Sequence, residues 1–293
     1  MASPASSLRI CRAYIVIQCP LVVSPPWLGL QLRARVQGFK NGLAGSNGPL
    51  IAAGTTGMTS TPPIDPAIPD SIEQLRRIGQ EFHTRSWSLG TSSNYSVVAS
   101  RNPLELLITA SGKDKSALGR DDFVRVDAAG GVCGGSSQKS SAETLLHCMI
   151  AELIPSVGAV LHTHSVWGTI LSDRDLPRGS LRIEGYEMLK GLEGIGTHET
   201  FEEVPIFANS QNMHELSQRI RDRFTASDWS HPTRQPFHGF LLSGHGLYTW
   251  GKDLAEARRH IEIFEFLFEA VARTRSLPPQ LSSHTKDLKN PRQ

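Results

Sequence analysis

Residues 158–165 read GAVLHTHS. The apolar start of this stretch is typical of a buried strand, and the strand ends in the pattern His-x-His. Side chains two positions apart on a strand point to the same face of the sheet. The imidazoles of His162 and His164 are therefore expected to converge on one point. A metal site is one interpretation, and a pair of hydrogen-bonded core histidines is the other.

A third imidazole is available further along the chain, in residues 241–248, which read LLSGHGLY. Glycines on both sides of His245 let the backbone crowd a site that bulkier residues would block. Three neutral histidines with an open fourth position are typical of a catalytic rather than a structural zinc site. On spacing alone, a structural role stays open for His245 as well.

Two carboxylates are candidates for proton chemistry. Glu187 lies between glycines in GYEMLKG, where the amphipathic pattern is weak, and a solvated helix face is the alternative. Glu143 lies at an expected helix start, where Ser140 and Glu143 already satisfy a capping-box pattern.

Small hydroxyl and glycine residues gather at expected strand ends and helix starts, where hydroxyls and free backbone N–H groups can hold a phosphate. Each group alone is an ordinary turn. Lys113, Lys115 and Lys139 offer positive charge nearby, although lysines in turns are usually surface residues. The groups are Thr91, Ser92, Ser93 and Asn94; Thr109, Ser111 and Gly112; and Ser136, Ser137, Ser140 and Ser141.

The composition excludes several classes of protein. The 293 residues carry a formal net charge of +2, too balanced for a protein held on nucleic acid or acidic lipid by bulk charge. No apolar run reaches the roughly 18 to 20 residues of a membrane-spanning helix. The four cysteines form no Cys-x-x-Cys pair, which favours a reducing compartment. One globular unit of the size of an enzyme, with tails, is the remaining expectation.

The composition also sets the expected limits of the folded domain. The first 64 residues contain five basic residues and no acid, whereas acids are frequent from Asp65 onward. Residues 1–68 are expected to be an extension outside the fold, which is disordered or carries a targeting signal. A third interpretation is that the true start is Met58 and that the stretch before it is not part of the native protein. Residues 277–293 are expected to be a polar tail, which leaves a catalytic domain over 69–276.

Within that domain, helical patterns alternate with short β-rich runs. Capping pairs at Ser71 and Gln74 and at Asp253 and Glu256 predict where the first and last helices begin. The order of elements predicts an α/β or α+β layered domain with a largely antiparallel sheet. Helices are expected near 71–87, 141–153, 166–172, 186–192, 213–224 and 253–271, and strands near 95–100, 105–109, 123–127, 158–162 and 204–207, with a hairpin over 239–250.

Several motifs, taken in order, resemble the class II aldolase and adducin family. They are SSN at 92–94, ITASG at 108–112, SSAETLLH at 140–147, AVLHTHS at 159–165 and GHGLYTWG at 244–251. Within the family, GYEMLKGLEG at 185–194 and VPIFAN at 204–209 resemble the dehydratases of methionine salvage. The resemblance covers about residues 70–275.

The resemblance implies a three-layer α/β/α domain in a homotetramer, with sites near the subunit interfaces. It implies one Zn²⁺ ion per subunit, held by His162, His164 and His245, and a general acid/base role for Glu187. Glu143 matches a carboxylate that the family's sugar-phosphate aldolases use. Its role here stays open, because animal dehydratases lack it and carry a substrate-contacting cysteine one position earlier. The residues expected to hold the phosphate are Asn94, Ser111, Gly112 and Ser141.

The reaction so implied is zinc-dependent dehydration of 5-methylthioribulose 1-phosphate to 2,3-diketo-5-methylthiopentyl 1-phosphate. Loss of the C3 proton and then of the C4 hydroxyl would need a Lewis acid and a proton donor. The cytoplasm is the expected location, with organellar targeting by residues 1–57 as the alternative. A class II aldolase or epimerase is the nearest rival function. An adducin-like binding module is another, and a complete set of three histidines argues against it.

Overall fold

The sheet contains nine strands in the order β4-β3-β2-β1-β5-β9-β8-β7-β6. The structure is a computed structural model that describes residues 67–230 and 235–278. Neighbouring strands are antiparallel except β7 and β8, which run parallel. The strands are β1 (Asn94–Arg101), β2 (Leu104–Thr109), β3 (Phe123–Asp127), β4 (Val132–Cys133), β5 (Ala159–Thr163), β6 (Ser180–Glu184), β7 (Phe201–Phe207), β8 (Gly239–Leu242) and β9 (Gly246–Gly251).

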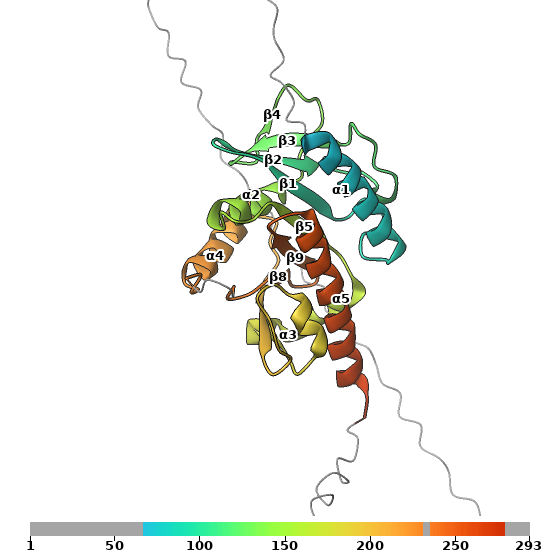
Figure 1. Cartoon of the computed structure of the whole chain (residues 1–293), viewed down its shortest axis with the longest axis vertical. Helices are drawn as coiled ribbons and strands as arrows, with labels where there is room; N and C mark the ends of the chain where they lie inside the picture. The colour runs from blue at the N-terminus through green and yellow to red at the C-terminus, as the bar shows by residue number, and fades with distance from the viewer. Residues whose placement is uncertain (1–66, 231–234, 279–293) are drawn as a thin grey trace, which may run out of the picture. The chain divides into compact units, whose positions relative to one another are not determined.

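Helices cover both faces of this sheet (Figure 1). One face packs against α1 (Ala67–Thr84), α3 (Val166–Asp175) and α5 (Leu254–Ser276). The other face packs against α2 (Thr144–Leu153) and α4 (Met213–Thr225). The predicted three-layer α/β/α arrangement with a largely antiparallel sheet is therefore confirmed. Three short 3₁₀ helices join the elements: η1 (Lys115–Ala117), η2 (Leu176–Arg178) and η3 (Glu187–Gly191).

The side chains of β5 alternate between the two cores. Ala159 and Leu161 belong to the core under α1, α3 and α5, whereas Val160 belongs to the core under α2 and α4. Both faces of the strand are buried, which explains why its sequence reads as an unbroken apolar run. By the same alternation, His162 points toward the side of α2.

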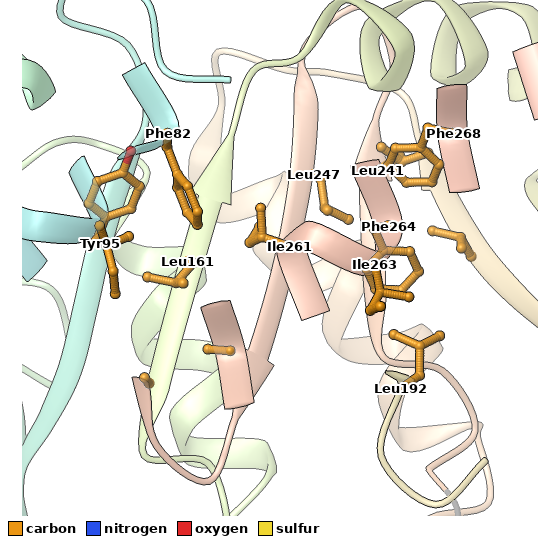
Figure 2. Packing of buried hydrophobic residues seen from close by; sticks show 14 of the residues in the cluster. Phe82, Tyr95, Leu161, Leu192, Leu241, Leu247, Ile261, Ile263, Phe264 and Phe268 are labelled. Carbon is orange, nitrogen blue, oxygen red and sulfur yellow. The ribbon is translucent and has the colours of Figure 1, made fainter. Parts of the chain in front are cut away.

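The larger core lies between α5, α1 and the sheet. Figure 2 shows Phe82 of α1 and Tyr95 of β1 close to Leu161, while Phe264 and Phe268 of α5 pack further along the sheet. All five side chains are buried. Burying an aromatic or leucine side chain contributes about 1.5 to 3 kcal/mol, so this layer holds β5 firmly in place.

Several local predictions are corrected. Helix α1 begins at Ala67, so Ser71 lies inside the helix and the predicted capping box at Ser71 is wrong. The expected helix at 186–192 is the short η3. Strands β4 and β6 were not predicted, because β4 has two residues and β6 alternates only twice between buried and exposed positions. At α5, the Asp253 side chain accepts a hydrogen bond from the backbone N–H of Glu256, as predicted.

Most of the expected extension over 1–68, and nearly all of the tail over 277–293, lies outside the described residues. None of the helices in the described ranges is long and apolar enough to cross a membrane. Cys133 and Cys148 are both free thiols.

Candidate active site

The three predicted imidazoles meet at one end of the sheet. His162 lies in β5, His164 follows that strand, and His245 lies in the turn between β8 and β9. The Nε2 atom of His164 is 2.7 Å from Nε2 of His162 and 3.1 Å from Nε2 of His245. Side chains from two distant stretches of sequence therefore present three nitrogen atoms to one point, and this cluster could hold a metal ion.

Pairing between β5 and β9 brings the two stretches together. In the register, Thr163 lies opposite Leu247, and His162 lies opposite Tyr248. A Cβ atom on Gly246 would lie 2.0 Å from the carbonyl oxygen of Thr163, well inside contact distance. Only glycine lets the backbone pass this close, so Gly246 is what allows His245 to lie beside the His-x-His pair.

The chemistry of the donor set fits a divalent metal. Nδ1 of His162 donates a hydrogen bond to the carbonyl oxygen of Leu247 at 2.8 Å, because a carbonyl can only accept. The Nε2 atom of the neutral ring therefore keeps a free lone pair toward the cluster. Burial lowers the pKa of His162 well below its ordinary value and that of His164 to about 4. Both rings are thus neutral, which is the form that binds a metal.

Glu143 lies against the histidines. Its Oε1 atom is 3.2 Å from Nε2 of His245, and its Oε2 atom is 3.9 Å from Nε2 of His162. Burial acts to raise the pKa of Glu143, but the hydrogen bonds that its carboxylate makes with His245 and with the amide of Asn94 outweigh it and hold the pKa well below its ordinary value. The carboxylate is therefore ionised.

The alternative interpretation of Glu143 as part of a capping box is wrong. Glu143 precedes α2 and makes no side-chain cap hydrogen bond. The Ser140 hydroxyl donates instead to the carbonyl oxygen of Gly130. The carboxylate of Glu143 is thus left free for the histidine cluster.

A cavity of about 270 Å³ opens beside the cluster. His164, His245 and Glu143 line it on one side. Its remaining wall is rich in serine, threonine and amide side chains, which suits a ligand with many oxygen atoms. All four residues predicted to hold a phosphate also line it, namely Asn94, Ser111, Gly112 and Ser141.

Glu187 lies elsewhere on this chain. It starts η3, its side chain is 65% exposed, and it is absent from the described lining of the cavity. One carboxylate oxygen is 2.6 Å from Nζ of Lys190, and the other is 3.8 Å from Nδ1 of His198. The hydrogen bond with Lys190 lowers the pKa of Glu187. A single chain therefore does not bring this carboxylate to the histidines.

Two residues of this region were given no specific role from the sequence. His147 is fully buried, and its Nε2 atom donates to Oδ1 of Asn94 while its Nδ1 atom accepts from the Ser96 hydroxyl. Its spacing of four from Glu143 places both on one face of the helix, a signal that could have found it. Lys115 also lines the cavity and is only 1% exposed, although its sequence context is that of a surface turn.

These features define a class of protein. The sequence profile of the class II aldolase and adducin N-terminal domain matches residues 73–272, and the chain belongs to this family. A methylthioribulose-1-phosphate dehydratase of Marinobacter nauticus is 48% identical over 205 residues, which cover 70% of this chain and 93% of the relative. One of Stenotrophomonas maltophilia is 43% identical over 220 residues, covering 75% and 98%.

Solved structures agree on the fold. YgbL of Escherichia coli superimposes with a TM-score of 0.57 at 24% sequence identity, covering 72% of this chain and 93% of that protein. At this identity the likeness concerns the fold alone.

Proposed function

We propose that this chain is a hydro-lyase that dehydrates methylthioribulose 1-phosphate in methionine salvage. The observation that carries the proposal is one cavity lined by two imidazoles of the three-histidine cluster, an ionised carboxylate and a wall of hydroxyl and amide groups. The relatives at 43 to 48% identity, which bear the name of this activity, support the choice of substrate.

The metal that we propose is one Zn²⁺ ion in each subunit, held by Nε2 of His162, His164 and His245. Three neutral imidazoles with one open position suit catalytic zinc. A divalent ion bound there would act as a Lewis acid that stabilises the negative charge left when the C3 proton of the substrate leaves. Leu247 orients the first of these rings through its carbonyl oxygen.

The hydroxyl-rich wall would hold the phosphate of the substrate. We assign this role to the groups of Asn94, Ser111, Gly112 and Ser141. Binding the phosphate at a fixed distance from the histidines orients C3 and C4 toward the catalytic groups, which is a large part of what a site must do.

Glu187 is proposed as the acid/base group, acting from a neighbouring subunit. Its exposure on the surface of one chain is consistent with a homotetramer whose interfaces carry the active sites. It would first take the C3 proton and then protonate the departing C4 hydroxyl, after which the enol tautomerises to the 2,3-diketone. Glu143, fixed against the imidazoles, would keep its negative charge beside the reacting atoms.

The free thiols Cys133 and Cys148 suit the proposed cytoplasmic location.

Product analysis tests this function. The purified, zinc-loaded protein is incubated with methylthioribulose 1-phosphate, and the products are followed by mass spectrometry and by carbonyl trapping. Dehydration yields a diketone that is lighter than the substrate by one water and no aldehyde fragment. Cleavage into two carbonyl compounds would instead establish an aldolase, and an inert, metal-free protein would favour a binding module.

A further inference from the structure

We propose that Lys115 is the cationic anchor for the phosphate group of the substrate. The inference rests on the proposed function only in taking a phosphate ester as the ligand. The proposed phosphate site so far consists of neutral hydroxyl and amide groups. Lys115 would add a charged residue to it, although its sequence context is that of an ordinary surface turn.

The charge balance of the cavity calls for a cation. A phosphate monoester carries close to two negative charges at neutral pH, and the ionised Glu143 lines the same cavity. Apart from the histidines, Lys115 is the only basic side chain among the described residues of the lining. Even with a divalent ion at the histidines, the phosphate and the carboxylate together carry about one negative charge more than that ion balances, and Lys115 supplies the missing positive charge.

The fold buries Lys115 through a close backbone approach. A Cβ atom on Gly79 of α1 would lie 2.4 Å from the carbonyl oxygen of Lys115, so the helix rests directly on η1. Asp114 caps η1 by accepting a hydrogen bond from the backbone N–H of Ser116 at 2.8 Å. The backbone that carries the lysine is therefore held on both sides, and the lysine lines the cavity together with Ser111 and Gly112.

The ammonium group of Lys115 has N–H donors that are not used within the described part of the chain. Its Nζ atom donates to the carbonyl oxygen of Lys113 at 2.7 Å, and no described carboxylate lies within ion-pair distance of it. Lys113, by contrast, pairs with Asp122 at 2.8 Å. A buried ammonium with N–H groups to spare is costly unless an anion satisfies them, and a bound phosphate supplies charge-assisted hydrogen bonds.

The lysine remains cationic enough for this role. Burial lowers the pKa of Lys115 to about 8, while the charges of Asp114, Glu143 and Asp122 act in the opposite direction. Near neutral pH most molecules therefore carry the charge before any ligand binds. A phosphate bound at the ammonium would raise the proportion further.

The test compares Lys115→Met with Lys113→Met in the zinc-loaded, full-length protein. Methionine keeps most of the length of the buried side chain, lacks its terminal atom, and removes the charge and the donors. Binding of inorganic phosphate is measured by ³¹P NMR titration, and KM and kcat are measured with the phosphorylated substrate. Because phosphate binding is read without turnover, the result stands even if the chain catalyses a different reaction.

The Lys115→Met variant is expected to bind inorganic phosphate about 10- to 100-fold more weakly and to show a similar rise in KM, since hydrogen bonds to charged groups contribute about 1.5 to 3 kcal/mol. Its zinc content should not change. Lys115→Arg should recover part of the affinity, and Lys113→Met should behave like the unchanged protein. Unaltered phosphate binding in Lys115→Met would overturn the assignment, as would an equal loss in Lys113→Met.

Discussion

Asn94 donates a hydrogen bond from Nδ2 to Oε2 of Glu143 at 2.6 Å. This bond joins the first residue of β1 to the residue before α2, across 49 positions of sequence. His147 holds the other end of the same amide, which fixes its orientation, since a ring N–H must face the amide oxygen. The amide thus presents a donor to a carboxylate that also contacts the histidine cluster.

Replacing the N–H donor of Asn94 by a carboxylate should harm the site more than removing the amide. Asn94→Asp would place a second carboxylate against Glu143 and keep an acceptor for His147, whereas Asn94→Ser shortens the side chain and removes both hydrogen bonds of the amide. Two carboxylates in contact cannot both be ionised without a large repulsion. We expect Asn94→Asp to lose at least about tenfold more activity than Asn94→Ser, as measured by kcat/KM. Equal losses in the two variants would show that the contact with Glu143 has no role in the reaction.

Removing one imidazole should abolish metal binding. In His164→Ala, the two remaining rings offer too few ligands for a stable zinc site. We expect zinc content and activity to be lost together, as measured by elemental analysis and by turnover on the same sample. His83→Ala is the matched control, because that ring lies on α1 and contacts the carbonyl oxygen of Ser88. Full zinc occupancy in His164→Ala would exclude this residue as a ligand.

The sequence predicts the position of a site residue best where the local geometry of one strand or helix decides it. The His-x-His pair could be predicted because alternation along a strand puts both rings on one face. His245 could be named as a candidate, but its place beside the pair depends on β9 being the neighbour of β5, which no local pattern specifies. The burial of Lys115 depends on Gly79, 36 positions away, so its turn-like context was misleading.

Glu143 illustrates a second limit of the sequence. Its pattern with Ser140 satisfied a capping rule, and only the structure shows that both side chains turn elsewhere. For Glu187, the structure of a single chain does not place the carboxylate near the histidines. Its sequence environment pointed to the site through a family resemblance, whereas on a single chain it lies exposed on η3, so the role that we propose for it depends on a neighbouring subunit.

Glu187→Gln should leave the fold and the zinc content intact and lower kcat by about 10² to 10⁴, the usual contribution of a general acid/base. Glu184→Gln is the control, because Glu184 is also exposed and pairs with Arg182. Near-normal turnover in Glu187→Gln would remove the proposed role.

Mixed assemblies test whether Glu187 acts across an interface. Co-expression of Glu187→Gln with His164→Ala would place intact histidines and an intact carboxylate on different chains. If the site is shared, random mixing should restore about one quarter of the activity, since half of the histidine sets would meet an intact carboxylate half of the time. If each site uses residues of one chain, the mixture would stay inactive.

Gly246→Ala should disrupt the site through the backbone. The new methyl group would collide with the carbonyl oxygen of Thr163, and the rigid pairing of β5 with β9 leaves little room to move. We expect a loss of about 1 to 3 kcal/mol in stability together with weaker zinc binding. Gly244→Ala is the matched control. Its φ of 61° disfavours alanine, but nothing lies within 4 Å of the new atom. Denaturation measures the stability of the two variants, and metal analysis measures their zinc affinity. Gly246→Ala should bind zinc clearly more weakly than Gly244→Ala, and similar zinc affinities would contradict the close approach.

Glu265 should make the stability of the protein depend on pH. It lies in α5, accepts a hydrogen bond from the Thr163 hydroxyl at 3.1 Å, and burial raises its pKa from 4.5 to about 7. Between these two values the unfolded chain releases a proton that the folded chain retains, so the free energy of unfolding falls as the pH rises from about 4.5 to about 7 and then levels off. Glu265→Gln cannot ionise and should lose this component. Urea denaturation at about pH 5 and about pH 8 measures the difference in free energy of unfolding between the variant and the unchanged protein. From the lower to the higher pH, this difference should change by about 2 to 3 kcal/mol in favour of the variant. A difference that stays constant would show that the buried carboxyl group does not titrate in this range.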